Sequence, residues 1–175
     1  VAIPSTISLA PSLSSGKGHF EEKEKIANLL ASSGFNEILT NSISNSRFYE
    51  EKGTVKMINS LSAELDVLRP SMLESGLQSI GFNLNRKNND LKFFEFGKIY
   101  HQTEGGFTET PMLGIWITGL INKPGWKEKE NTADFFYLKG ILSNICRRLG
   151  AGEPEYRPEG HRQLTDYATI SLHGK

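Results

Sequence analysis

Cysteine is almost absent from this sequence. The single cysteine, Cys146, has no partner for a disulfide within the chain, and such scarcity favours a reducing, cytoplasmic setting. Cys146 lies at the end of the apolar run 141–146. That position predicts a buried structural thiol in preference to a nucleophile.

An excess of charge of either sign is absent too. Lysine and arginine together number 20, and aspartate and glutamate together also number 20. A chain without net charge produces no overall electrostatic field that would attract a polyanion. The net charge therefore does not indicate a dedicated nucleic-acid-binding module. Local basic patches remain compatible with this balance.

Long hydrophobic runs are missing, since no stretch approaches the roughly 20 apolar residues that cross a bilayer. We therefore expect no membrane partner. The segment 1–4 has neither the basic head nor the apolar run of a signal peptide. The chain ends at residues 173–175, inside what reads as a hairpin, and we expect it to be a piece of a larger protein.

The sequence has enough phenylalanine to build a core, with ten copies and a hydrophobic content of 37% in 175 residues. Hydrophobic periodicity predicts an α+β domain with one sheet, antiparallel strands and helices mostly on one face. The expected helices cover 18–33, 72–85 and 135–149, and the expected strands cover 35–43, 55–58, 91–101, 112–120 and 155–172. Gly34 and Gly150 are expected to end helices, Asp134 to begin one, and Gly105-Gly106 to form a hairpin tip.

No arrangement of residues typical of catalysis or metal binding is evident. The four histidines, His19, His101, His161 and His173, are scattered without metal-ligand spacing. The glycines of 150–152 followed by Arg157 resemble a nucleotide-binding pattern, but we interpret them as a helix cap. The glycines of 16–18 lack the longer pattern of a phosphate loop, and we interpret them as linker.

Glu95 and the aromatic blocks each allow two interpretations. Glu95 alternates with Phe94 and Phe96 along a strand, so it either faces solvent or pairs with a base such as Arg69 or Arg86. The aromatic runs 93–96 and 135–137 could stack nucleic-acid bases. They lack interleaved arginine and lysine apart from Lys92 and Lys98, and we favour core packing and subunit burial.

Four blocks carry a resemblance to a known family. They are Gly34-Phe35-Asn36-Glu37-Ile38 with Ser42, then residues 59–73 with Asn83, Asn85 and Arg86, then 94–100, and finally Asp134-Phe135-Phe136-Tyr137-Leu138-Lys139-Gly140. In order and spacing the chain resembles the β subunit of bacterial phenylalanyl-tRNA synthetase over nearly its whole length. Ser60 replaces the family's usual proline and Pro70 replaces a frequent threonine, which leaves only local turn geometry in doubt.

The resemblance implies a fold, a set of partners and a domain division. The fold would be a class II synthetase-like antiparallel sheet flanked by helices, with 1–17 as an arm, 18–150 as the core and 151–175 as its truncated C-terminal strands. The family works as an α2β2 assembly in which the α subunit holds ATP, with magnesium, and phenylalanine, and the complex binds tRNA. Helix 18–33 with strand 35–43 would face the α subunit. The acidic, magnesium-associated segment that precedes Ile3-Pro4 in the family is not in this sequence.

The resemblance also predicts that this chain performs no chemistry. Catalytic relatives place an arginine after the strand that appears here as 97–100, and an acid two positions later. Those positions hold His101 and Thr103, which are poor substitutes for a bidentate guanidinium and a carboxylate. We expect no catalytic, cofactor-binding or metal-binding residue in the chain. The alternatives are a regulatory or active class II synthetase paralogue that binds an amino acid or ATP.

Overall fold

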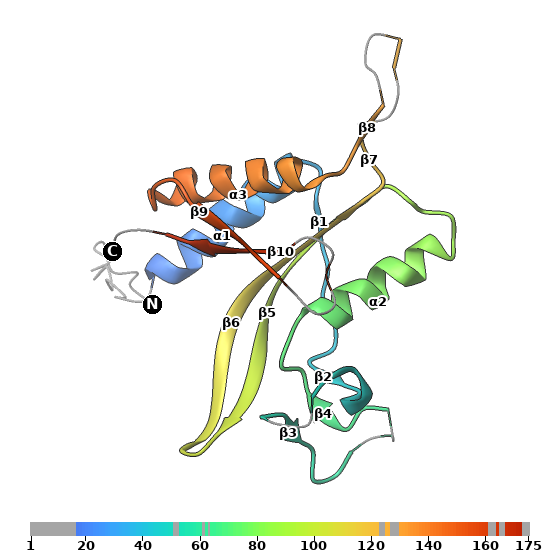
Figure 1. Cartoon of the computed structure of the whole chain (residues 1–175), viewed down its shortest axis with the longest axis vertical. Coiled ribbons are helices and arrows are strands. Elements are labelled where there is room, and N and C mark those ends of the chain that lie inside the picture. The colour runs from blue at the N-terminus through green and yellow to red at the C-terminus, as the bar shows by residue number, and fades with distance from the viewer. Residues whose placement is uncertain are drawn as a thin grey trace, which may run out of the picture.

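A computed structural model describes residues 17–50, 53–60, 62, 64–122, 125–126, 130–160, 164 and 167–172. Figure 1 shows three helices arranged around one long, curved β-hairpin, with smaller pairs of strands at its periphery. The predicted α+β class is confirmed. Most of the arm predicted over 1–17 lies outside the described residues, and the described chain is helical from its first residue, Lys17.

The long hairpin is the centre of the main sheet. Strand β5 (Leu91–Thr103) pairs antiparallel with β6 (Gly106–Thr118) along its whole length. Residues 104–105 form the turn, and Gly106 has a φ of 125°, a conformation that glycine adopts without steric cost. The predicted strong strand and hairpin tip are therefore confirmed, and both strands are longer than periodicity alone indicated.

The strand predicted over 35–43 is much shorter in the structure. It is reduced to β1 (Asn36–Glu37), which pairs parallel with β5, and to β2 (Ile43–Ser44) in another sheet. The main sheet is therefore not purely antiparallel. The last backbone bond to β5 runs from the Ile38 N–H to the Phe94 carbonyl at 2.8 Å. Beyond it the Thr40 hydroxyl bonds to side chains, and Asn41 accepts a hydrogen bond from the Ile43 N–H at 2.9 Å.

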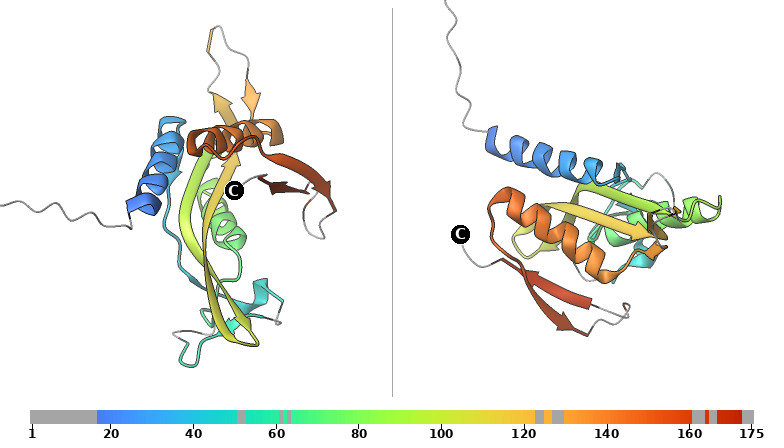
Figure 2. Two further views of the ribbon diagram at one scale, coloured as in Figure 1. Left: turned by 90° about the vertical axis from the view of Figure 1, so that its left-hand side faces the viewer. Right: turned by 90° about the horizontal axis from the view of Figure 1, so that it is seen from above.

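Helices cover both faces of the hairpin (Figure 2). On one face α1 (Lys17–Ser32) packs beside α3 (Phe135–Leu149), and Phe94 of β5 is buried against Leu30 and Ile141. On the other face α2 (Leu73–Leu84) covers Phe93 and Trp116. Successive residues of a strand point to opposite faces, so neighbours Phe93 and Phe94 anchor the two separate cores.

Backbone hydrogen bonds explain where α1 ends. Gly34 adopts a φ of 84°, the Gly34 N–H donates to the Ala31 carbonyl at 3.0 Å, and the Phe35 N–H donates to the Leu30 carbonyl at 3.0 Å. This is a Schellman motif, in which Phe35 also packs on Leu30. The Gly34 cap is confirmed.

The predicted ends of α3 are also confirmed. The Asp134 carboxylate accepts a hydrogen bond from the Tyr137 N–H at 2.7 Å, and Gly150 follows the last helical residue with a φ of 69°. Arg147 and Arg148 lie in the last turn, where their positive charge opposes the negative end of the helix dipole.

We expect Asp134→Ala to lower the free energy of unfolding by about 1 kcal/mol, because the Tyr137 N–H loses its acceptor at the start of α3. Urea titration followed by circular dichroism measures the change. Glu130→Ala removes the same charge from an exposed position before the helix and should have little effect. Equal losses in the two variants would contradict the capping role.

Short strands form the rest of the described structure. The strands β2, β4 (Val67–Leu68) and β3 (Val55–Lys56) make a small antiparallel sheet beside a 3-10 helix, η1 (Ser46–Phe48). The strands β7 (Leu120–Asn122) and β8 (Asn131–Thr132) form a separate antiparallel pair. The strands β9 (Glu155–Glu159) and β10 (Tyr167–Ser171) form a C-terminal hairpin. Within the described ranges, no helix has the length and apolar character to span a membrane.

Candidate functional site

A buried arginine, Arg69, lies at the centre of a group of hydrogen-bonded side chains between α2 and the hairpin. The side chains of Arg69 and Glu95 are each only 1% exposed, and Arg69 Nη2 donates to Glu95 Oε1 at 3.0 Å. Of the two interpretations of Glu95, pairing with Arg69 is the correct one. Such a pair is tolerated in a protein interior only where further hydrogen bonds satisfy both groups.

Those further hydrogen bonds come from three segments of the chain. Arg69 Nε donates to the Lys98 carbonyl at 3.0 Å, and Nη1 donates to the Thr40 hydroxyl at 2.7 Å and to the Ser75 hydroxyl at 3.3 Å. The Thr40 hydroxyl in turn donates to Glu95 Oε2 at 2.6 Å. We call Thr40, Arg69, Ser75 and Glu95 the arginine network.

The arginine network explains why glycine occupies position 97. A β-carbon on Gly97 would overlap Arg69 Nη2 and would lie 2.7 Å from the terminal methyl of Met72. The guanidinium therefore occupies the space beside Gly97 that a side chain at this position would fill. In the block 94–100, Phe94 packs in the core, Glu95 pairs with Arg69 and Gly97 leaves room for it.

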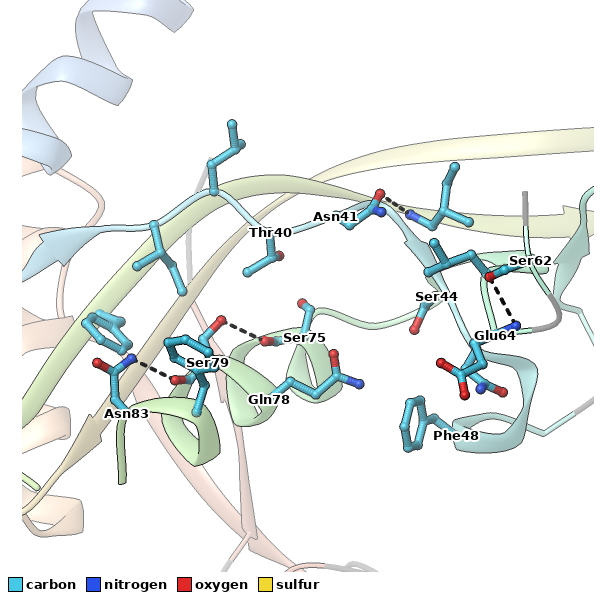
Figure 3. Close-up of a pocket in the computed structure, with 17 residues that line it drawn as sticks. Thr40, Asn41, Ser44, Phe48, Ser62, Glu64, Ser75, Gln78, Ser79 and Asn83 are labelled. Atoms are coloured by element: carbon cyan, nitrogen blue, oxygen red, sulfur yellow. Dashed lines mark hydrogen bonds between the residues drawn. The ribbon is translucent and has the colours of Figure 1, made fainter. Parts of the chain in front are cut away.

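Two hollows flank this network. The polar groove, about 920 Å³, lies between α2 and the extended segment 38–45, and Figure 3 shows Gln78, Ser79 and Asn83 of α2 facing Thr40 and Asn41 across it. The apolar cleft, about 730 Å³, lies on the α1 side and is lined by side chains that include Phe20, Leu39 and Met112.

Among the residues that the structure describes, none that lines the polar groove is basic. Glu64 is the one charged residue of this described lining, and most of the other polar lining groups are hydroxyls and amides. In the apolar cleft, Arg69 is occupied by the arginine network, Lys98 pairs with Glu109, and Lys23 Nζ lies 4.9 Å from the ring centre of Phe96. Each cation of the cleft therefore already has a protein partner.

The positions that the resemblance equates with a catalytic arginine and acid, His101 and Thr103, lie at the far end of β5. His101 is half-buried and Thr103 is exposed. Of the other histidines, His19 belongs to α1, whereas His161 and His173 lie outside the described residues. The described part of the chain contains no cluster of three or more His, Cys, Asp or Glu able to hold a metal ion.

The two glycine patterns are structural where the chain is described. Gly150 caps α3, and Arg157 lies on β9 with its Nη2 3.8 Å from Glu155 Oε2. In the other pattern Gly16 is outside the described residues, but Lys17 and Gly18 begin α1. The interpretation of these two residues as linker is therefore wrong, because the helix extends one residue before its predicted start.

The remaining predictions on single residues were correct in part. Cys146 is half-buried, and burial together with the nearby charge of Glu153 raises the pKa of its thiol, which disfavours the nucleophilic thiolate. Phe93 and Phe94 are buried, as core packing requires, but Phe135 and Phe136 are exposed. The interpretation as core is therefore wrong for Phe135 and Phe136 but correct for Tyr137, which packs against the core, and burial of the two exposed rings by another subunit stays a prediction.

Sequence reasoning missed Thr40, Ser75 and Gly76. The first two complete the arginine network, and Gly76 leaves space for the indole of Trp116. A large ring in a close-packed interior needs a neighbour without a projecting side chain. Glycine in the middle of an apolar helix was therefore a signal in the sequence for such a contact. No local signal points to Thr40 or Ser75, which meet Arg69 only in three dimensions.

The fold places the chain among the class II aminoacyl-tRNA synthetase-like domains. It resembles a pyrrolysyl-tRNA synthetase from Desulfitobacterium hafniense with a TM-score of 0.64 at 19% identity, over 89% of this chain and 56% of that one. It also resembles a histidine–tRNA ligase subunit from Alicyclobacillus acidocaldarius with a TM-score of 0.62 at 12% identity, over 90% of this chain and 46% of that one.

The chain belongs to the phenylalanyl-tRNA synthetase β chain family, because the profile described as "Phenylalanyl tRNA synthetase beta chain CLM domain" matches residues 3–175. Among its relatives, the phenylalanine–tRNA ligase β subunit of Bacteroides fragilis is 38% identical over 86% of this chain. That of Thermotoga maritima is 30% identical over 85%. The chain spans about a fifth of these relatives, 20% and 19% of their lengths.

Proposed function

We propose that this chain is the non-catalytic core of a phenylalanine–tRNA ligase β subunit. It scaffolds a catalytic α subunit, in an α2β2 assembly, for the ATP-dependent attachment of phenylalanine to its tRNA in the cytoplasm. The observation that carries this proposal is the state of Arg69, whose guanidinium is 1% exposed and engaged with Glu95, Thr40, Ser75 and the Lys98 carbonyl. An arginine bound in this way cannot also hold the phosphates of ATP.

The charges of the two hollows support the same conclusion. ATP needs positive charge around its phosphates, and the described lining of the polar groove includes Glu64 but no lysine or arginine. In the apolar cleft Lys98 is paired with Glu109. In this proposal ATP, magnesium and phenylalanine therefore bind to the α subunit.

The apolar cleft has the character of a subunit interface. Phe20 of α1 and Met112 of β6 are exposed on its walls, and Leu39, which follows β1, is 91% exposed. Large apolar side chains gathered at one exposed site indicate a contact surface. Phe20 and Leu39 belong to segments 18–33 and 35–43, which the family resemblance assigns to contact with the α subunit, and Met112 lies beside them on β6.

Co-purification tests the proposal. The chain is mixed with the matching α subunit and analysed by size-exclusion chromatography with light scattering, where we expect one stable complex. Leu39→Asp should weaken assembly by about tenfold or more, because it places a charge in the apolar contact. Ile58→Asp, at an equally exposed position outside the cleft, should assemble normally.

Isothermal titration separates this proposal from a regulatory or active paralogue. We expect no heat of binding when the chain alone is titrated with ATP or with phenylalanine. Binding of phenylalanine alone would favour a regulatory paralogue. Binding of ATP that is lost in His101→Ala would favour an active class II enzyme and overturn the scaffold proposal.

A further inference from the structure

Most polar side chains of the polar groove form hydrogen bonds without carrying charge, and Glu64 is the one charged lining residue among the described residues. Its hydroxyl and amide side chains are Thr40, Asn41, Ser44, Asn45, Ser62, Ser75, Gln78, Ser79 and Asn83. A triphosphate would find no cation on its walls, and a purely apolar ligand would bury many polar groups. The lining suits a neutral ligand with several donors and acceptors.

Amide groups on two sides of the groove have unused hydrogen-bonding capacity. Among the described residues, the Gln78 side chain forms no hydrogen bond. Asn83 uses its amide nitrogen to donate to the Ser79 carbonyl at 2.9 Å, and Asn41 uses its oxygen to accept from Ile43. Side-chain amides of this kind pair with the edges of nucleic-acid bases.

Aromatic rings stand at the rim of the same groove. Phe82 of α2 is 57% exposed and Phe48 of η1 is 49% exposed, and both are lining residues. Figure 3 shows Phe48 beside Glu64 at the end of the groove opposite Asn83. An exposed ring beside free amides is the arrangement on which unpaired bases stack, whatever their identity.

Positive charge lies just outside the groove, against the ring of Phe82. The Arg86 guanidinium carbon lies 3.4 Å from the ring centre of Phe82, and Arg86 Nη1 donates to the Phe82 carbonyl at 2.9 Å. Lys87 follows with a φ of 65°, a left-handed conformation that is strained for a lysine. Arg47 precedes Phe48 and is exposed, but it lines a separate hollow.

From this arrangement we infer that the polar groove binds an unpaired segment of RNA. Bases stack on Phe82 and Phe48, the amides of Gln78 and Asn83 contact base edges, and the phosphates lie outside, at Arg86. The largely uncharged lining and the outer guanidinium of Arg86 separate base from phosphate, as single-stranded nucleic acid requires. An extended peptide would fit the amides, but it gives no role to the guanidinium that lies against the Phe82 ring.

The inference rests on the proposed function, in which the RNA is the tRNA charged by the complex. The test uses the assembled complex of full-length α and β subunits and a phenylalanine tRNA transcript. In Phe82→Ala we expect the Kd for tRNA, measured by fluorescence anisotropy, to rise about tenfold. Arg86→Ala should weaken binding less, and should lower its dependence on salt.

Leu77→Ala is the matched control, because Leu77 is an exposed residue of the same helix outside the groove. We expect its tRNA affinity, and the tRNA-independent activation of phenylalanine in all three variants, to be unchanged. An unchanged Kd in Phe82→Ala would overturn the inference.

The two proposals fail in distinguishable ways. Light scattering of each variant reports assembly. If no complex forms, the scaffold proposal is contradicted, and tRNA binding is then measured on the β chain alone. If Phe82→Ala assembles and binds tRNA normally, only the inference that the polar groove binds RNA is contradicted. Tight binding of free nucleosides, without a gain from a connected RNA chain, would likewise contradict it.

Discussion

Replacing Arg69 with methionine is expected to destabilise the protein by about 3–5 kcal/mol. The loss exceeds that of an ordinary ion pair because the Glu95 carboxylate would remain buried, with only the Thr40 hydroxyl bound to it. Urea unfolding followed by tryptophan fluorescence measures the change. The double variant Arg69→Met, Glu95→Leu should recover much of the loss, because it leaves no unpaired charge in the interior.

An exposed pair supplies the control. Arg147 Nη2 lies 3.2 Å from Glu153 Oε1, and both side chains are largely exposed to solvent. Arg147→Met should therefore cost at most about 1 kcal/mol. If Arg69→Met and Arg147→Met had similar effects, the arginine network would not be the polar centre of the fold.

The second large effect is expected from Gly76→Ala in α2, where two physical effects oppose each other. Alanine in place of glycine stabilises a helix interior by about 1 kcal/mol. At this position, however, the added methyl would overlap the indole nitrogen and ring carbons of Trp116, which is buried against α2. Overpacking of this kind costs about 1–3 kcal/mol or more, so we expect net destabilisation and a shifted tryptophan emission.

The same helix provides the matched control at Gly81. A β-carbon on Gly81 meets no atom within 4 Å, so Gly81→Ala should raise stability by about 0.5–1 kcal/mol. The two substitutions are chemically identical and should have opposite signs. Destabilisation of both would show that α2 tolerates no added methyl at all, and would contradict the specific role of Trp116.

Local patterns in the sequence were sufficient for the regular elements. The three helices, the long hairpin and the caps at Gly34, Asp134 and Gly150 were all predicted, because each depends on residues within a few positions. A strand was also predicted where β1 lies, but its shortness was not. After β1 the Thr40 hydroxyl bonds to the side chains of Arg69 and Glu95, which are far away in the sequence.

The candidate site could be predicted only where the sequence preserves a local signal. Alternation along β5 predicted that Glu95 faces away from Phe94 and Phe96, and limited its partner to a base or solvent. Choosing Arg69 over Arg86 required the structure, which places Arg86 on the exposed ring of Phe82 instead. The exposure of Phe135 and Phe136 likewise could not be predicted from the pattern of residue types in the sequence.

The sequence by itself determined the class of fold and the family, since both are written in residues at fixed spacing, and the absence of a catalytic arginine and acid stays a prediction from the same spacing. Only the tertiary structure decided that Arg69 is buried and hydrogen-bonded through all three of its side-chain nitrogens, that helices cover both faces of the sheet, and that amides, rings and Arg86 meet around the polar groove. These features join segments such as 38–45 and α2, and contacts between distant segments are set by packing and burial, not by the order of neighbouring residues.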